Sequence, residues 1–125
     1  MDSWAEIVKG EDFSAHASAS EQGILVSLGG TADLTVKVHL DTFLHDVHSE
    51  AQRRLAQVVT VDLRKMDFMN SSCLRSLVWW ISTVQEQPRE AQYRITFLHN
   101  PSVRWQLRSL NSLARIASNI ITIRA

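Results

Sequence analysis

The sequence predicts an α/β domain with a mixed sheet, because strand-like and helix-like patterns alternate along it. Residues 13–18 and 24–28 alternate apolar and polar side chains around a Ser-Glu-Gln-Gly turn, which is typical of a hairpin with one buried face. Residues 58–63 are almost wholly apolar and β-branched, as expected of a central strand covered on both sides. Residues 71–85 then carry apolar side chains at helical spacing.

The remaining elements follow from turn and cap signals. Gly29-Gly30 is expected to end the hairpin, and residues 31–40 are ambiguous because their apolar residues alternate as in a strand. Asp41 is a plausible cap for a helix to about Leu55. The second helix is expected to end before Pro88 and to turn these side chains inward: Leu74, Leu77, Val78, Ile81 and Val84. A strand over 93–98, a third helix starting at Asn100-Pro101 and a strand over 120–123 complete the prediction.

The length and charge of the chain indicate one domain without an overall electrostatic field. The 125 residues divide into an extension at 1–12, with Trp4 and Ile7 expected against the core, and a single domain at 13–125. The formal net charge is zero, which disfavours binding to nucleic acid or anionic membrane through overall charge. The acidic first 50 residues and the arginines of 91–125 are expected to lie side by side and neutralise each other. The alternative is an arginine-rich docking surface.

The compartment expected is the cytoplasm. The single cysteine excludes an internal disulfide, and no apolar run has the length of a membrane span or the pattern of a signal peptide.

Asn70-Ser71-Ser72 is the most informative segment, because it lies between the predicted central strand and the second helix. Asn and Ser side chains accept hydrogen bonds from the unpaired N–H groups at a helix start. The helix dipole attracts negative charge to the same place, so a phosphate group would be stabilised there. Capping alone is a sufficient explanation of these three residue types.

This arrangement resembles the STAS domains, named for sulfate transporters and anti-sigma factor antagonists. In that family a strand ending in Asp-Leu leads through Phe to an Asp-Ser-Ser/Thr-Gly turn and an apolar helix. Here Asp62-Leu63, Phe68 and the turn Asn70-Ser71-Ser72-Cys73 match, with Asn70 in place of Asp and Cys73 in place of Gly. The resemblance implies a STAS-like fold, with helices packed mainly on one face of the sheet and a loop and helix start within residues 31–40.

The resemblance and the helical spacing of the residues after it together give the expected site residues. Ser71 aligns with the family's phosphorylated serine, with Ser72 as the alternative, and Arg75 lies one turn later where it could pair with the phosphate. Trp79 shares a stripe with Ser72, Ser76 and Thr83 that is expected to face outward, as an anchor for another protein; alternatively it lies beneath the extension that carries Trp4. The expected partner-binding residues are Asn70, Ser72, Cys73, Arg75, Ser76 and Trp79.

Other chemistries have weaker support in the sequence. His45 and His48, with Asp41 nearby, have the spacing of a metal pair but lack the further ligands that zinc needs, so a solvated helix face is expected and no metal. No nucleophile elbow, P-loop or dinucleotide fingerprint is present, so neither an enzyme nor a cofactor is expected. Cys73 is either a small packed residue or, less favoured, a reactive redox-sensing thiol.

The function that the resemblance implies is that of a bacterial anti-sigma factor antagonist, a partner-switching regulator of transcription. Its partners would be an anti-sigma factor or serine kinase, and a phosphatase, with phosphorylation at Ser71 ending the interaction. No nucleic acid or direct membrane insertion is expected, and a homo-oligomer is possible. The alternative is a non-phosphorylated STAS accessory subunit of a transporter or signalling assembly, which Asn70 and Cys73 favour.

Overall fold

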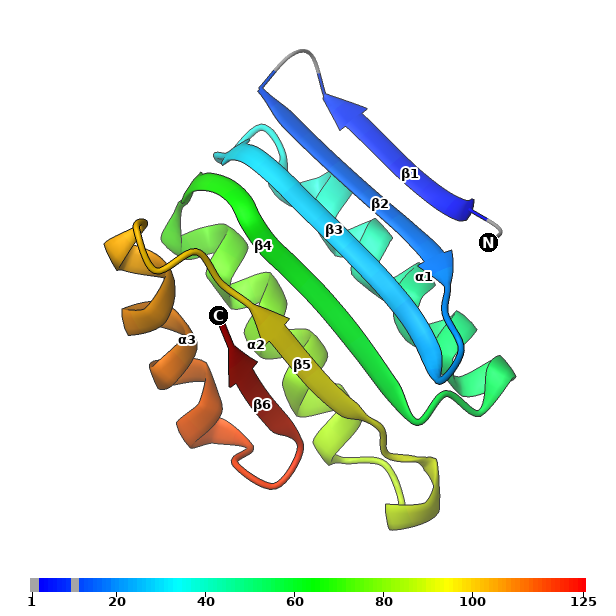
Figure 1. Cartoon of the computed structure of the whole chain (residues 1–125). Helices are drawn as coiled ribbons and strands as arrows, with labels where there is room; N and C mark the ends of the chain where they lie inside the picture. Colours follow the sequence, from blue (N-terminus) through cyan, green and yellow to red (C-terminus); the bar gives the residue numbers. More distant parts are fainter. Residues whose placement is uncertain (1–2, 10–11) are drawn as a thin grey trace.

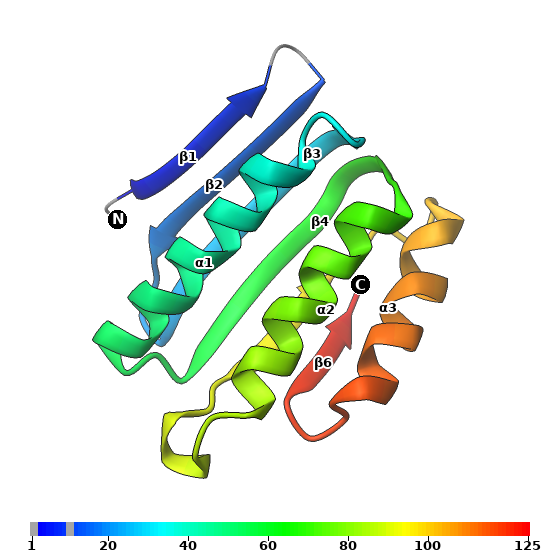
Figure 2. The same ribbon diagram turned by 180° about the vertical axis from the view of Figure 1, so that it is seen from behind.

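The computed structural model describes the backbone of residues 3–9 and the whole of residues 12–125. In this part of the chain one six-stranded sheet carries three α-helices on one face, and the other face is free of helices (Figure 1, Figure 2). The strands, in spatial as well as sequence order, are β1 Ser3–Lys9, β2 Phe13–Ala19, β3 Gly23–Ala32, β4 Val58–Met69, β5 Arg94–Leu98 and β6 Ile121–Arg124. The helices are α1 Lys37–Arg54, α2 Ser71–Gln85 and α3 Arg104–Ile116, with a 3-10 turn at Arg89–Ala91.

The sheet is mixed, as the sequence predicts. The pairs β1–β2 and β2–β3 are antiparallel, whereas β3 to β6 are parallel neighbours. Val59, Val61 and Leu63 point toward the helices and are buried, while the residues between them lie on the other face and are half-buried. The predicted α/β fold, with its hairpin and its helices on one face, is confirmed.

Strand β1 lies within residues 1–12, the segment expected to be an extension. It pairs along β2 and forms one edge of the sheet. The side chains of Trp4 and Ile7 are outside the described part of the structure, so their expected packing and the division at residue 12 stay predictions.

Gly29-Gly30 does not end β3, contrary to the prediction. The strand continues to Ala32, and its pairing with β4 shifts register at Gly29 and again after Gly30. Gly30 has φ +88, and a Cβ built there would lie 1.9 Å from the carbonyl oxygen of Asp12. The glycines therefore allow a close approach of β2 and an irregular register rather than a strand end.

The ambiguous segment 31–40 is a loop followed by a helix start. Asp33 closes the loop, because its Oδ1 accepts hydrogen bonds from Thr35 N at 2.9 Å and Thr35 Oγ1 at 2.6 Å. Helix α1 begins at Lys37, so the prediction of Asp41 as its cap is wrong: Asp41 lies one turn inside the helix and pairs with Lys37 at 3.0 Å.

Helix α2 has the predicted bounds, β5 begins one residue later than predicted, and β6 is shifted by one residue at both ends. The third helix begins at Arg104 and not at Pro101. Asn100 caps a turn instead, since its Oδ1 accepts from Ser102 N at 2.9 Å.

Among the residues whose side chains are described, no ion pair joins the first 50 residues to the last 35. β1 and β6 form opposite edges of the sheet, and the ion pairs found among the described residues are local. Asp41 pairs with Lys37, and Glu50 pairs with Arg53 and Arg54 on the same helix. The arginines of the last 35 residues therefore remain without carboxylate partners in the described structure.

A polar network at the edge of the core joins α1 and α2 to Tyr93, the residue before β5. Trp80 Nε1 donates to Tyr93 Oη at 2.7 Å, and Tyr93 Oη lies 2.8 Å from His48 Nδ1. The tyrosine oxygen accepts from the indole and has one proton of its own, which it can donate to Nδ1 only when that nitrogen is unprotonated. Burial, and secondarily the nearby His45, lowers the pKa of His48.

This network predicts a loss of stability in mild acid. Below the unfolded-state pKa of about 6.5, unfolded chains take up a proton that the folded His48 resists, so the free energy of unfolding should fall as the pH is lowered through that value. Urea unfolding at about pH 7.5 and about pH 5.5 measures the effect. His48→Gln, which can still accept from Tyr93, should show a smaller pH dependence, whereas His39→Gln on the exposed side of α1 should behave as wild type. Equal pH dependence of wild type and His48→Gln would contradict the assignment.

Candidate functional site

The candidate site is the junction between β4 and α2. Asn70 has an extended backbone, with φ −75 and ψ 169, and its Oδ1 accepts from Cys73 N at 2.9 Å. The first turn of α2 contains no acidic residue, so the positive end of the helix dipole is not neutralised by the helix itself. The predicted helix cap is thus present, and the site favours an anion.

Two contacts tie this junction to the end of β3. Asn70 N donates to Ala32 O at 2.9 Å, and Cys73 Sγ donates to Asp33 O at 3.4 Å. The end of β4, the start of α2 and the loop before α1 are therefore held together as one rim of the domain.

Ser71 is exposed at the first position of α2, and Ser72 is half-buried beside it. Arg75, one turn after Ser71, is also exposed and has no acidic partner among the described residues. Both side chains are therefore accessible to solvent, one helical turn apart on α2.

Ser76 does not face outward, and its prediction as a surface residue beside Trp79 is wrong. It is 1% exposed, accepts a hydrogen bond from Lys37 Nζ at 3.0 Å and donates to Ser72 O at 3.5 Å. The cause is the packing of α1 against α2 at this point, which places Lys37 and its ion partner Asp41 over Ser76. A serine is small enough to fit beneath the lysine stem.

Cys73 is fully buried on the inward side of α2. Burial raises the pKa of its thiol, and this outweighs the opposing effect of Lys37. The position fits a small packed residue; it does not fit a reactive thiol, and it leaves Cys73 out of direct contact with a partner.

Trp79 is 37% exposed and packs against His45 of α1, with 4.0 Å between ring centroids. The alternative placement beneath the extension is not supported by the backbone, because α1 lies between α2 and β1 (Figure 2). The two histidines that have the spacing of a metal pair thus have other partners: His45 packs on the Trp79 indole and His48 is hydrogen-bonded to Tyr93. No group of three metal-ligating side chains occurs in the described part of the chain.

Exposed apolar side chains lie along the same rim. Leu34 follows Asp33, whose carbonyl oxygen accepts from Cys73 Sγ, and is 68% exposed. Phe68 lies two residues before Asn70 and is 49% exposed. We group them with Trp79, which lies about two turns farther along α2 beside His45, and call the three the apolar rim: Leu34, Phe68 and Trp79. Apolar side chains grouped around a polar centre are typical of protein-binding surfaces.

Helix α3 supports the last part of β4, a role that sequence analysis missed. Gln106 is fully buried, and its Nε2 donates to Leu63 O at 2.8 Å and Met66 O at 2.7 Å while its Oε1 accepts from Asn100 N at 2.8 Å. Trp105 Nε1 donates to Asp67 O at 2.8 Å. The available signal was a polar residue in phase with Leu110 and Leu113 on the inward face of an amphipathic helix.

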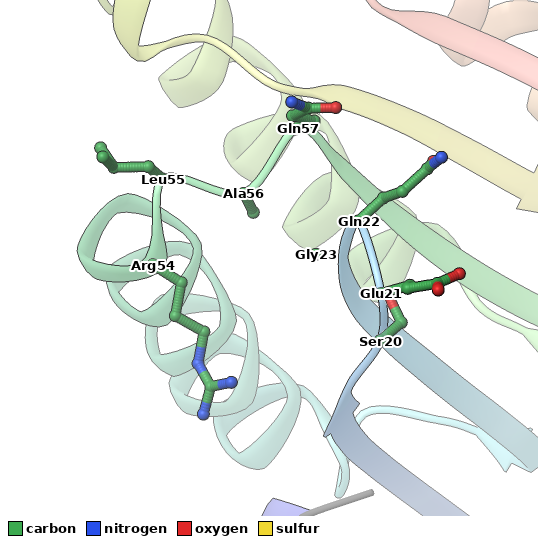
Figure 3. A pocket seen from close by; sticks show the side chains of 8 residues that line it. All are labelled: Ser20, Glu21, Gln22, Gly23, Arg54, Leu55, Ala56 and Gln57. Atoms are coloured by element: carbon green, nitrogen blue, oxygen red, sulfur yellow. The ribbon is translucent and has the colours of Figure 1, made fainter.

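A recess of ≈ 310 Å³ lies at the opposite end of the parallel strands, where β3 and β4 begin. Its lining residues are Ser20, Glu21, Gln22, Gly23, Arg54, Leu55, Ala56 and Gln57 (Figure 3). Arg54 runs along α1 and its Nε lies 2.8 Å from Glu50 Oε1, so the cation of this recess has a carboxylate partner, which it shares with Arg53.

Comparison with known proteins shows what this fold is similar to. No protein-family model matches the sequence, and no curated protein is similar to it. The solved structure of an anti-sigma factor antagonist from Mycobacterium paratuberculosis is similar, with a TM-score of 0.63 over 93% of this chain and 90% of that one. The fold is therefore similar to that of an anti-sigma factor antagonist. Sequence identity is 14%, so the similarity concerns the STAS-like fold itself.

The predicted resemblance to STAS domains is thereby confirmed at the level of the fold. None of the helices in the described ranges is long and apolar enough to cross a membrane.

Loss of the cap should destabilise this antagonist-like fold. Asn70→Ala removes the acceptor for Cys73 N and should lower the free energy of unfolding by about 1 kcal/mol. Asn70→Asp keeps the acceptor and adds a charge favoured by the dipole, so it should be at least as stable as wild type. Asn111→Ala, on the exposed side of α3, is the matched control and should cost little. Urea unfolding measures all three, and an Asn70→Ala variant as stable as wild type would show that the cap is dispensable.

Truncating a side chain to alanine should have different effects on the buried and the exposed side of α2. Leu77 is fully buried, so Leu77→Ala should lower the free energy of unfolding by about 2–5 kcal/mol. Trp79→Ala should cost less stability, because the indole is partly exposed, and should weaken partner binding more. Urea unfolding and a binding titration on both variants separate the effects. If Trp79→Ala unfolds the domain as readily as Leu77→Ala, the apolar rim is part of the core and not a docking surface.

Proposed function

We propose that this protein is a partner-switching regulator that binds an anti-sigma factor or a related serine kinase through the start of α2. The observation that carries the proposal is the exposed Ser71 at the Asn70-capped helix N-terminus, in a fold similar to an anti-sigma factor antagonist. The domain acts by binding rather than by catalysis, in the bacterial cytoplasm.

The apolar rim supports a protein as the partner. Leu34, Phe68 and Trp79 come from three different elements of the chain and remain exposed in the isolated domain. Their burial in an interface would contribute binding energy, and aromatic side chains commonly carry a large share of such energy. The exposed Ser71 and Arg75 add polar contacts beside them.

Phosphorylation at Ser71 would control this binding. A phosphoserine carries about −1.5 to −2 charges, which the free helix N-terminus tolerates and Arg75 can partly neutralise. In a complex the same charge must be desolvated or face acidic partner groups, so it costs binding energy. Ser72 is the second candidate acceptor, with a less accessible position. A phosphatase would reverse the modification.

A structural accessory subunit remains the second candidate function. Two observations favour it: the Asn70 side chain serves as a cap, and Cys73 fills a buried place. Both keep the helix start well ordered, and neither requires chemistry at Ser71.

The Ser71→Asp variant tests the switch. It should weaken binding of the partner captured by wild type by at least about tenfold, or about 1.4 kcal/mol, while leaving the free energy of unfolding nearly unchanged. A binding titration and urea unfolding measure both quantities.

The control is Ser118→Asp, which adds a charge to an exposed loop at the far end of the strands and should not affect binding. Equal binding by wild type and Ser71→Asp would favour the accessory subunit.

A further inference from the structure

A second recess lies on the helix-free face of the sheet, away from Ser71. Its volume is ≈ 480 Å³ and it extends over β4, β5 and β6. The lining residues are Gln22, Gln57, Val58, Thr60, Arg94, Thr96, Leu98 and Arg124. This face is the one turned to the viewer in Figure 1. The recess is therefore formed by side chains of β4, β5 and β6, together with Gln22 and Gln57 just before β3 and β4.

Two threonines form the middle of the recess. Thr60 and Thr96 are neighbours in the β4–β5 register. Thr96 is only 9% exposed, although it lies on the face of the sheet that no helix covers. Neither hydroxyl has a hydrogen-bond partner in the described part of the protein. Both are available to a ligand as donors and acceptors.

Two arginines flank the threonines. Arg94 precedes Thr96 by two residues on β5, and Arg124 of β6 is the register partner of Leu98, two residues beyond Thr96. The two positions are thus offset along the strands by roughly 13 Å, a span that two arginine side chains can close upon a ligand between them.

The charge of these arginines is not neutralised within the described residues. Neither guanidinium pairs with a carboxylate, and no acidic residue lines the recess. The acidic residue on the same face, Asp62, is already paired with Arg64 at 2.8 Å. The recess of ≈ 310 Å³, which shares Gln22 and Gln57 with this one, differs because its arginine, Arg54, forms an ion pair with Glu50.

These features select a ligand with separated negative charges. Arginine forms strong, geometrically defined hydrogen bonds to phosphate, and hydroxyl and amide groups complete such sites. No aromatic side chain lines the recess, which argues against stacking of single-stranded nucleic acid on this sheet. We propose that the recess binds a soluble organic diphosphate, with its phosphate groups between Arg94 and Arg124 and in contact with Thr60 and Thr96.

The test is a titration of the full chain with inorganic pyrophosphate, followed by the backbone amide signals in two-dimensional NMR. Saturable shifts are expected at Thr60, Thr96 and their strand neighbours. Inorganic phosphate should bind about tenfold more weakly, because a single anion cannot engage both arginines.

Variants locate the binding. Arg94→Gln and Arg124→Gln should each weaken pyrophosphate binding by about tenfold, and Thr96→Val by about threefold, since each removes a donor from the site. Arg108→Gln, an exposed arginine on the helix side of the protein, is the matched control and should bind as wild type. Thermal unfolding of each variant checks that the fold is retained, which is expected because both recess arginines are exposed.

Three results would overturn the proposal. The first is an absence of shifts on β4 and β5 at saturating pyrophosphate. The second is binding that Arg108→Gln weakens as much as Arg94→Gln does. The third is binding to another anionic probe without binding to pyrophosphate. Binding to a poly-glutamate peptide would assign the face to an acidic protein, and binding to vesicles containing phosphatidic acid would assign it to a lipid headgroup. None of these results depends on Ser71, so they are independent of the switch.

Discussion

The hydrogen bond from Asn70 N to Ala32 O is the constraint on which the proposed site depends. Through it the ends of two parallel strands meet at the residue that caps α2. The Asn70 side chain satisfies an N–H of the helix while its main chain continues the sheet, so one residue determines both where the strand ends and in which direction the helix leaves. The exposure of Ser71 follows from this geometry, because the next residue along the chain must turn away from the sheet.

Sequence patterns predict those elements whose signals are local. Helix α2 has its predicted bounds because the cap, the apolar periodicity and the following proline agree. The predictions failed where tertiary contacts override local preference. Gly29-Gly30 has the composition of a turn, yet the neighbouring strands hold it in the sheet. Asp41 has the composition of a cap, but Asp33 closes the preceding loop, so the helix begins one turn earlier.

The candidate site was predictable to a smaller extent. The capping role of Asn70 and the surface position of Ser71 follow from a strand-to-helix junction. The burial of Ser76 does not, because it depends on which helix crosses α2, and that is a property of the packed sheet. The roles of Lys37 and Gln106 were missed for the same reason: each acts on backbone or side chains about 40 residues away in the sequence.

The contact between His45 and Trp79 has a practical consequence. A protonated imidazole quenches the emission of an indole that it touches, so the intrinsic fluorescence of this domain contains a signal from the seam between α1 and α2. The chain has three other tryptophans, Trp4, Trp80 and Trp105, so the signal of Trp79 is obtained as the difference between wild type and Trp79→Phe. The domain thus carries its own optical reporter, and occupancy of this surface can be followed without attaching a dye.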